Sequence, residues 1–162
     1  MTPTIALLHL CAIAIPALVA VWTDLSTMRI PNRISIAMLV IFIVVVPLTL
    51  PLGEIPGRLI VAGIVFAIGL ALYALGQMGA GDVKFAAAVF LFVDPADVTF
   101  FMRILGVMAL AGLLTHRMLG RMPAMRAMAP NWTSWTAKGV FSYGVALSLS
   151  LIYYLMLIAL GG

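Results

Sequence analysis

The chain has 162 residues, of which 65% are hydrophobic and only 9% are charged. Together with a mean hydropathy of +1.23, this composition excludes an ordinary soluble globular domain and indicates an integral membrane protein. We expect one all-α domain over residues 1–162 that is embedded in a lipid bilayer and has no nucleic acid as a partner.

Six apolar runs follow one another along the chain, and most approach the roughly 20 residues that a helix needs to cross a bilayer. They predict about six transmembrane helices, near residues 4–22, 33–51, 57–76, 83–97, 98–115 and 139–160. No Lys or Arg precedes the first run, so we expect a retained span rather than a cleaved signal. The fourth run is interrupted early, at Asp94, and should be short, recessed or extended at its ends.

Lysine and arginine concentrate on one side of the predicted bundle. They lie after the first run, after the third run, and between the fifth and sixth, at Arg29, Arg33, Lys84, Arg117, Arg121, Arg126 and Lys138. The positive-inside bias makes that side cytoplasmic and puts both termini outside. We expect the basic, Met- and Trp-bearing stretch 116–138 to lie along the membrane interface, with substrate contact as the alternative.

Asp24 comes at the expected C-terminal end of the first helix, where the helix macrodipole disfavours an acid. An ionisable residue in such an apolar setting is by default a functional-site hypothesis. The structural alternative is an ion pair with Arg29, but surface pairs contribute only about 0–1 kcal/mol. Downstream, Ile30-Pro31-Asn32 offers Asn32 as the cap of the second helix.

Asp82 stands in the motif Gly79-Ala80-Gly81-Asp82-Val83-Lys84. Its structural alternative is the N-cap of the helix that follows. Gly79 and Gly81 favour a functional interpretation, because glycines permit positive φ and let another chain approach closely. Such a site can hold an extended peptide next to a carboxylate. Lys84 either favours the ionised form of Asp82 or extends to the membrane interface.

The two aspartates fall on the same predicted face, where they can share a proton. An aspartyl protease needs this pair: one ionised carboxylate activates water, and one protonated carboxyl polarises the scissile carbonyl. The pair should titrate as a unit, and the residues do not say which acid is the base. No metal centre is expected, because Cys11 is the only cysteine and His9 and His116 lie toward opposite faces.

These motifs resemble those of a known family. Asp24 followed by Arg29-Ile30-Pro31-Asn32, and then the Gly79–Lys84 motif two spans later, is similar to the type IV prepilin peptidases, the GxGD class of membrane aspartyl proteases. The segment Ser142-Tyr143-Gly144-Val145-Ala146 resembles that family's Pro-Tyr-Gly-x-Ala element, with Ser142 in place of proline.

The resemblance implies a GxGD protease fold with two catalytic residues, Asp24 and Asp82. It also implies that the site is shaped, or substrate bound, by Gly79, Gly81, Lys84, Tyr143 and Gly144. From the residue type alone, Tyr143 fits an interfacial aromatic belt equally well.

The family resemblance also implies a reaction. Its members cut the basic leader from prepilins and pseudopilins after a glycine, at the cytoplasmic face of the bacterial inner membrane. Larger members add a cytoplasmic loop with paired CxxC zinc ligands and N-methylate the new amino terminus. With one cysteine, this chain looks like the short TadV/CpaA-like form that serves the tight-adherence (Flp) pilus. We therefore expect cleavage without N-methylation and without a cofactor.

Other functions remain open. Paired membrane acids also mark ion pathways, so a proton-relay or transport subunit is one alternative, with its acids near mid-bilayer. A non-catalytic pilus-assembly scaffold is another. A presenilin-like GxGD protease is the nearest enzymatic alternative, but there a tyrosine normally precedes the first aspartate, whereas here Thr23 precedes Asp24.

Overall fold

The computed structural model describes residues 1–136 and 142–161, which form helices joined by short turns. The six longer helices are α1 Pro3–Thr27, α2 Asn32–Thr49, α3 Ile55–Ala74, α4 Ala80–Phe90, α5 Val98–Leu119 and α7 Tyr143–Ala159. The shorter elements are η1 Leu52–Glu54, η2 Pro95–Asp97, α6 Pro123–Met128 and η3 Thr133–Trp135. The predicted all-α class is confirmed for the described part of the chain.

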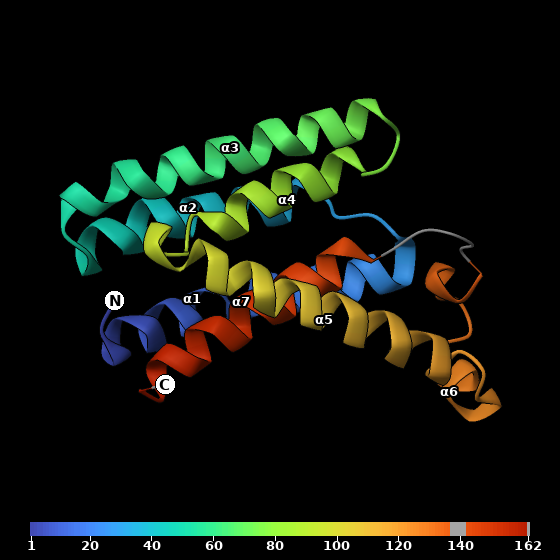
Figure 1. The fold of residues 1–162 in the computed structure, drawn as a ribbon. Helices are drawn as coiled ribbons and strands as arrows, with labels where there is room; N and C mark the ends of the chain where they lie inside the picture. Colours follow the sequence, from blue (N-terminus) through green and yellow to red (C-terminus); the bar gives the residue numbers. More distant parts are fainter. Residues whose placement is uncertain (137–141, 162) are drawn as a thin grey trace.

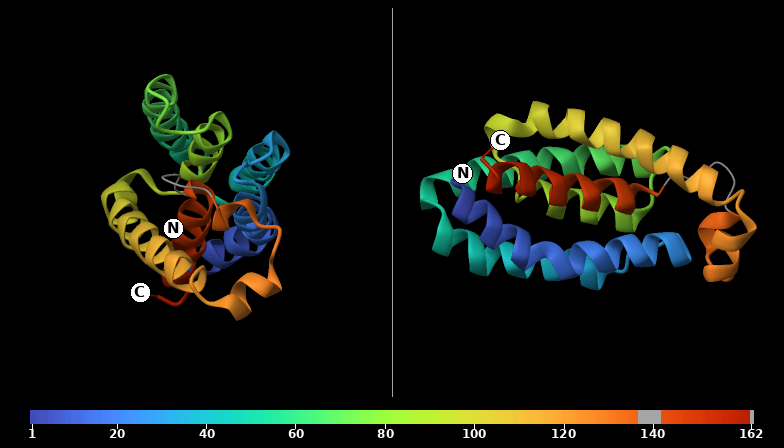
Figure 2. Two further views of the ribbon diagram at one scale, coloured as in Figure 1. Left: turned by 90° about the vertical axis from the view of Figure 1, so that its right-hand side faces the viewer. Right: turned by 90° about the horizontal axis from the view of Figure 1, so that it is seen from below.

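The longer helices run alternately in opposite directions along one bundle (Figure 1). Both termini lie at one end, which we call the terminal end; the second view in Figure 2 shows the same arrangement. The α1–α2 and α3–α4 connections and the segment with α6 and η3 lie at the other end. We call this the acid end, because Asp24 and Asp82 lie there.

Four helical stretches are long and apolar enough to cross a membrane: Pro3–Thr27, Asn32–Thr49, Leu52–Ala74 and Pro95–Leu119. Helix α7 is equally apolar but has 17 residues, and α4 has 11. At about 1.5 Å per residue, α4 covers roughly half of a bilayer core. These helices fit a membrane protein, while the count of about six spans and the orientation of the bundle stay predictions.

Helix α1 continues past the predicted run to Thr27, so that Asp24 lies in its last turn. Hydroxyl groups bond back to the preceding turn and allow these polar residues to stay helical: Thr23 Oγ1 donates to the Val19 carbonyl (3.0 Å), and Thr27 Oγ1 donates to the Thr23 carbonyl (2.8 Å). The helix ends at Met28, which adopts the left-handed conformation with φ of 53°.

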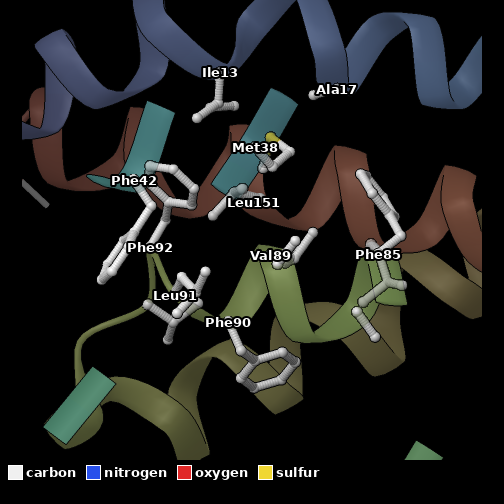
Figure 3. Close-up of a cluster of buried hydrophobic side chains, with 14 of the residues drawn as sticks. Ile13, Ala17, Met38, Phe42, Phe85, Val89, Phe90, Leu91, Phe92 and Leu151 are labelled. Carbon is white, nitrogen blue, oxygen red and sulfur yellow. The ribbon is translucent and has the colours of Figure 1, made fainter. Parts of the chain in front are cut away.

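Helix α4 is short because it is buried in the bundle, where it contacts α2, α3 and α7. The turn that follows it, Leu91 to Val93, is also buried. Aromatic rings pack edge to face around it: Phe92 lies 6.0 Å from Phe42, and Phe90 lies 5.0 Å from Phe101 (Figure 3). The hydrophobic core therefore fixes the helix that carries Asp82.

A buried arginine joins the elements of the terminal end. The Arg58 side chain is 0% exposed, and its Nη2 lies 3.4 Å from Asp94 Oδ2 and 3.6 Å from Glu54 Oε2. Beside it, the Tyr154 hydroxyl donates to Asp97 Oδ2 (2.8 Å) and accepts from the Asp94 backbone N–H (3.3 Å). These contacts tie α3, the α4–α5 turn and α7 together at the end away from the paired aspartates.

Candidate active site

The Asp24 carboxylate is 3% exposed and lies at the beginning of α7. Its Oδ2 accepts a hydrogen bond from the backbone N–H of Val145, at 3.2 Å. The positive N-terminal end of a helix favours an anion. The sequence places Asp24 at the unfavourable end of its own helix, and the structure adds a compensating helix N-terminus from the far end of the chain.

The Asp82 carboxylate lies in the first turn of α4 but is not the N-cap. Helix α4 begins at Ala80, so Gly79 holds the cap position and Asp82 is the third helical residue. From there its Oδ2 accepts from the Gly79 N–H at 3.2 Å, as an acidic residue at this position does in a capping box. The structural alternative for Asp82, an N-cap position, is therefore wrong. Burial raises the pKa of the Asp82 carboxyl, which precedes the predicted fourth span, and the Gly79 hydrogen bond opposes that rise.

The two aspartates come together at the acid end. They belong to the last turn of α1 and the first turn of α4 (Figure 1), and the Asp24 carboxylate is close enough to Asp82 to be repelled by its charge. No ion pair of the described residues joins Asp24 to Arg29 or Asp82 to Lys84. Among the described residues, the charge that acts on the Asp24 carboxylate is that of Asp82.

Two glycines allow the loop between α1 and α2 to pack against the first turn of α4 and the start of α7. A Cβ on Gly81 would lie 2.5 Å from the Ile30 carbonyl oxygen, and a Cβ on Gly144 would lie 2.6 Å from Ile30 Cδ1 and 2.9 Å from Asp24 Oδ2. Close approach to another segment was predicted at Gly81, but the segment is the chain's own loop. The positive φ suggested for Gly79 and Gly81 is wrong: of the described glycines, only Gly76 and Gly161 have it.

Lys84 contacts the beginning of α2. Its Nζ donates to Asn32 Oδ1 at 3.1 Å. Helix α2 begins at Asn32 with Pro31 in the cap position and no side-chain cap bond. The predicted capping role of Asn32 is therefore wrong, because its side-chain oxygen accepts from Lys84 instead.

The beginning of α7 is joined to both loops of the acid end. The Tyr143 hydroxyl donates to the Gln77 carbonyl at 3.5 Å, in the α3–α4 loop. The Ser142 hydroxyl lies 3.7 Å from Met28 Sδ, in the α1–α2 loop. The family motif usually has proline at this position. Proline has no hydroxyl group, so it could not make this contact with Met28.

An apolar groove of about 630 Å³ opens beside these loops, with walls from α3, α4, α5 and α7. At the acid end its lining includes Met78 and Tyr143, which adjoin Gly79 and Gly144, and along α5 it includes Gly106. The groove therefore runs from the neighbourhood of the acids along the apolar part of the bundle. Nothing in the order of residues signals it, because its walls come from four helices.

Stacked rings hold the segment after α5 against α1. Trp22 packs edge to face on Trp132 (5.5 Å), Trp132 stacks on Trp135 (5.7 Å), and Trp135 stacks on His116 (4.7 Å). The rings thus pack within the protein, while Arg117, Arg121 and Arg126 are exposed and Lys138 lies outside the described residues. An interfacial position for this segment stays a prediction.

The two histidines lie at opposite ends of the bundle. His9 is buried in α1 near the terminal end, with Nε2 2.8 Å from Thr49 Oγ1. His116 lies in the last turn of α5, at the acid end. Within residues 1–136 and 142–161, no three His, Cys, Asp or Glu side chains gather into a group that could bind a metal ion.

A bundle of apolar, membrane-length helices with two neighbouring carboxylates at one end defines a class of helical membrane proteins with a paired-acid site. The sequence profile of the type IV leader peptidase family matches residues 11–161, and the chain belongs to this family. The predicted family is thus confirmed, and with it a leader peptidase activity on prepilin substrates. Comparison with curated proteins gave no significant match, and comparison with solved structures gave none.

Proposed function

We propose that this protein hydrolyses the peptide bond between the basic leader and the apolar helix of Flp-type prepilins and pseudopilins, with Asp24 and Asp82 as the catalytic pair. The observation that carries the proposal is the meeting of these two acids, 58 residues apart in sequence, at the end where the basic loops lie. Two acids on a proton pathway would more usefully be spaced along the bundle than placed together at one end.

The chemistry follows from the mutual repulsion of the two carboxylates. Repulsion disfavours the doubly ionised pair, so the site holds one proton over a wide pH range. The ionised carboxylate takes a proton from water as it attacks the scissile carbonyl, and the protonated carboxyl donates to the carbonyl oxygen. Breakdown of the tetrahedral intermediate returns a proton to the leaving amine. Backbone N–H groups of Val145 and Gly79 hold the two acids in place for these transfers.

The substrate is proposed to enter along the groove that reaches Met78 and Tyr143. Its walls are almost wholly apolar side chains, which suits the helix that follows the cleavage point in a prepilin. In this proposal Tyr143, Gly79, Gly81 and Gly144 shape the cleavage site, and Lys84 anchors the start of α4 on α2. The basic loops face the cytoplasm, the termini face outward, and the chain works as one domain in the inner membrane.

The proposal includes cleavage without N-methylation. Methylating members carry paired CxxC zinc ligands, whereas Cys11 is the single cysteine of this sequence and lies on α1. Mass spectrometry of the processed pilin tests this part: an unmethylated amino terminus is expected, and a methylated terminus made by the purified protein would contradict it.

The test of the catalytic pair is co-expression with a candidate Flp-type prepilin and comparison of precursor and product on a gel. Asp24→Asn and Asp82→Asn keep the size of each side chain and one acceptor oxygen but cannot ionise. We expect each to lower the cleavage rate by about 10²–10⁴-fold or more. Asp97→Asn, at the terminal end, is the matched control and should process normally. Normal processing by Asp24→Asn or Asp82→Asn at wild-type protein levels would refute the proposal and favour a scaffold or a relay.

A further inference from the structure

A second apolar groove, of about 470 Å³, lies between α2, α3 and α4. Its apolar lining includes Ile36 and Leu39 on α2 and Phe66 on α3, all of them exposed. It shares no lining residue with the groove that reaches Tyr143. Neither aspartate lines the second groove, which reaches the acid end through Asn32 and Lys84.

The acid end of this second groove is polar and favours a negative charge. Lys84 lines it with an exposed ammonium group, bonded to Asn32 at 3.1 Å. Ser35 also lines it, is only 9% exposed, and has a buried hydroxyl without a hydrogen-bond partner. A buried hydroxyl that bonds to nothing in the protein points to a ligand or water. Helix α2 begins at the same place without a side-chain cap, which adds free N–H groups and a positive dipole end.

We propose that this groove binds an anionic phospholipid, with the headgroup phosphate on Lys84 and Ser35 and an acyl chain along Ile36, Leu39 and Phe66. The apolar part of the groove matches the acyl chain of such a lipid, and the Lys84 ammonium and Ser35 hydroxyl at its end match the phosphate. A prepilin fits less well, because its leader is basic and Lys84 repels it. The inference is independent of the proposed proteolysis, since the groove contains neither aspartate.

The location links the lipid to the acid end. The bound headgroup joins the beginning of α2 to the beginning of α4, through Asn32 and Lys84. These two helix starts flank the close contact between Ile30 and Gly81. The lipid therefore reinforces, from the membrane side, the packing that positions Asp82.

The test is lipid binding by the purified full chain in detergent, measured by native mass spectrometry without any prepilin. Phosphatidylglycerol and phosphatidylcholine with identical acyl chains are titrated separately. Both lipids carry the phosphate, but the choline ammonium of phosphatidylcholine cancels its charge, so we expect phosphatidylglycerol to bind beside Lys84 about fivefold more tightly. Lys84→Met should abolish this preference. Arg121→Met, which removes the same charge elsewhere at the acid end, should retain it.

Filling the groove provides the second arm. A Cβ on Gly63 meets no atom within 4 Å, so Gly63→Leu adds a side chain to the groove without a backbone clash and should abolish lipid binding. Gly106→Leu is the matched control: its Cβ is equally free, but it lines the other groove, and lipid binding should persist. Ser35→Ala, a milder change, should weaken phosphatidylglycerol binding severalfold and keep the fold.

Three results would overturn the inference. The first is equal affinity for the two lipids, and the second is wild-type lipid binding by both Gly63→Leu and Lys84→Met. The third is displacement of the lipid by millimolar inorganic phosphate, which would assign the polar end to free phosphate. If Gly63→Leu instead raises the KM for prepilin while lipid binding is unchanged, the groove belongs to the substrate. Because the lipid titrations contain no prepilin, the first three results do not bear on whether Asp24 and Asp82 cleave it.

Discussion

The carbonyl oxygen of Ile30 lies only 2.5 Å from the position that a Cβ on Gly81 would occupy. The loop after α1 and the first turn of α4 therefore meet backbone to backbone. On its other side, the same Ile30 lies against Gly144 at the start of α7. Since α1 carries Asp24 and α4 carries Asp82, this contact sets the spacing of the two acids, and any side chain at either glycine must change it.

Alanine at these glycines should damage both stability and cleavage. In Gly81→Ala the new methyl group meets the Ile30 backbone, which cannot rotate away. In Gly144→Ala it meets side-chain atoms of Ile30 and Asp24, and burial of both residues limits their movement. We expect a loss of about 1–3 kcal/mol in unfolding free energy, as for other overpacked sites, with cleavage strongly reduced. Thermal unfolding in detergent and the gel assay measure the two effects. Gly112→Ala, where a Cβ meets nothing within 4 Å, is the control, and a normal Gly81→Ala protein would contradict the argument.

Gly79→Ala should separate catalysis from stability. Its Cβ would lie 2.7 Å from Asp82 Oδ2, which is the end of a side chain that can rotate. The carboxylate then moves and loses its bond to the Gly79 N–H, while the fold is kept. We expect kcat to fall with little change in Tm. If Tm falls as far as in Gly81→Ala, then Gly79 serves packing rather than the position of the acid.

The pH profile of cleavage should show its acidic limb above the ordinary range of aspartate. A free aspartate side chain titrates near 3.9, and burial raises the pKa of Asp82. A carboxyl with a raised pKa keeps its proton to a higher pH. As the pH falls, the pair therefore becomes doubly protonated, and loses its base, earlier than an exposed pair would. Measurement of kcat/KM against pH on a leader peptide, with Tm followed over the same range, checks this; full activity at pH 4 would be inconsistent with it.

Arg58→Gln should destabilise the bundle without touching the chemistry. The variant loses the contacts of a fully buried guanidinium with Asp94 and Glu54. Because the Asp94 and Glu54 side chains are 23% and 41% exposed, water replaces part of the lost contact, and we expect a loss of about 1 kcal/mol. Tm should fall accordingly, while cleavage at low temperature stays normal. Arg103→Gln, an exposed arginine near the beginning of α5, provides the comparison and should leave Tm unchanged. Equal Tm values for the two variants would show that the Arg58 contacts do not stabilise the fold.

The order of the helices could be predicted from the sequence, because in a membrane protein the length of an apolar run indicates the length of the helix that it forms. Boundaries were less predictable, since they depend on local bonds. Helix α1 runs on to Thr27 through hydroxyl bonds to its own backbone, and α4 begins at Ala80, so Asp82 falls within its first turn rather than at its cap. In both cases, moving the helix boundary by a few residues changes the groups that the aspartate contacts.

The partners of the site residues were the least predictable, because they are distant in sequence. Gly81 was expected to let another chain approach closely; the segment that approaches it is the chain's own loop at Ile30, which nothing local identifies. The N–H of Val145 lies 121 residues after Asp24, and only the packed bundle brings them together. From the sequence, Lys84 either favours the ionised form of Asp82 or extends to the membrane interface. In the structure it donates a hydrogen bond to Asn32, which neither interpretation includes.

The bond from Val145 to Asp24 also has a consequence for how the protein is made. The first helix leaves the ribosome carrying its aspartate long before α7 exists, and until then the carboxylate lacks the N–H group that holds it. A chain that stops short of α7 contains both aspartates yet has no anchored pair. Helix α7 thus completes the surroundings of an aspartate that α1 carries. With Asp24 as the proposed catalytic acid, the chain cannot cleave a prepilin before α7 has been made and packed.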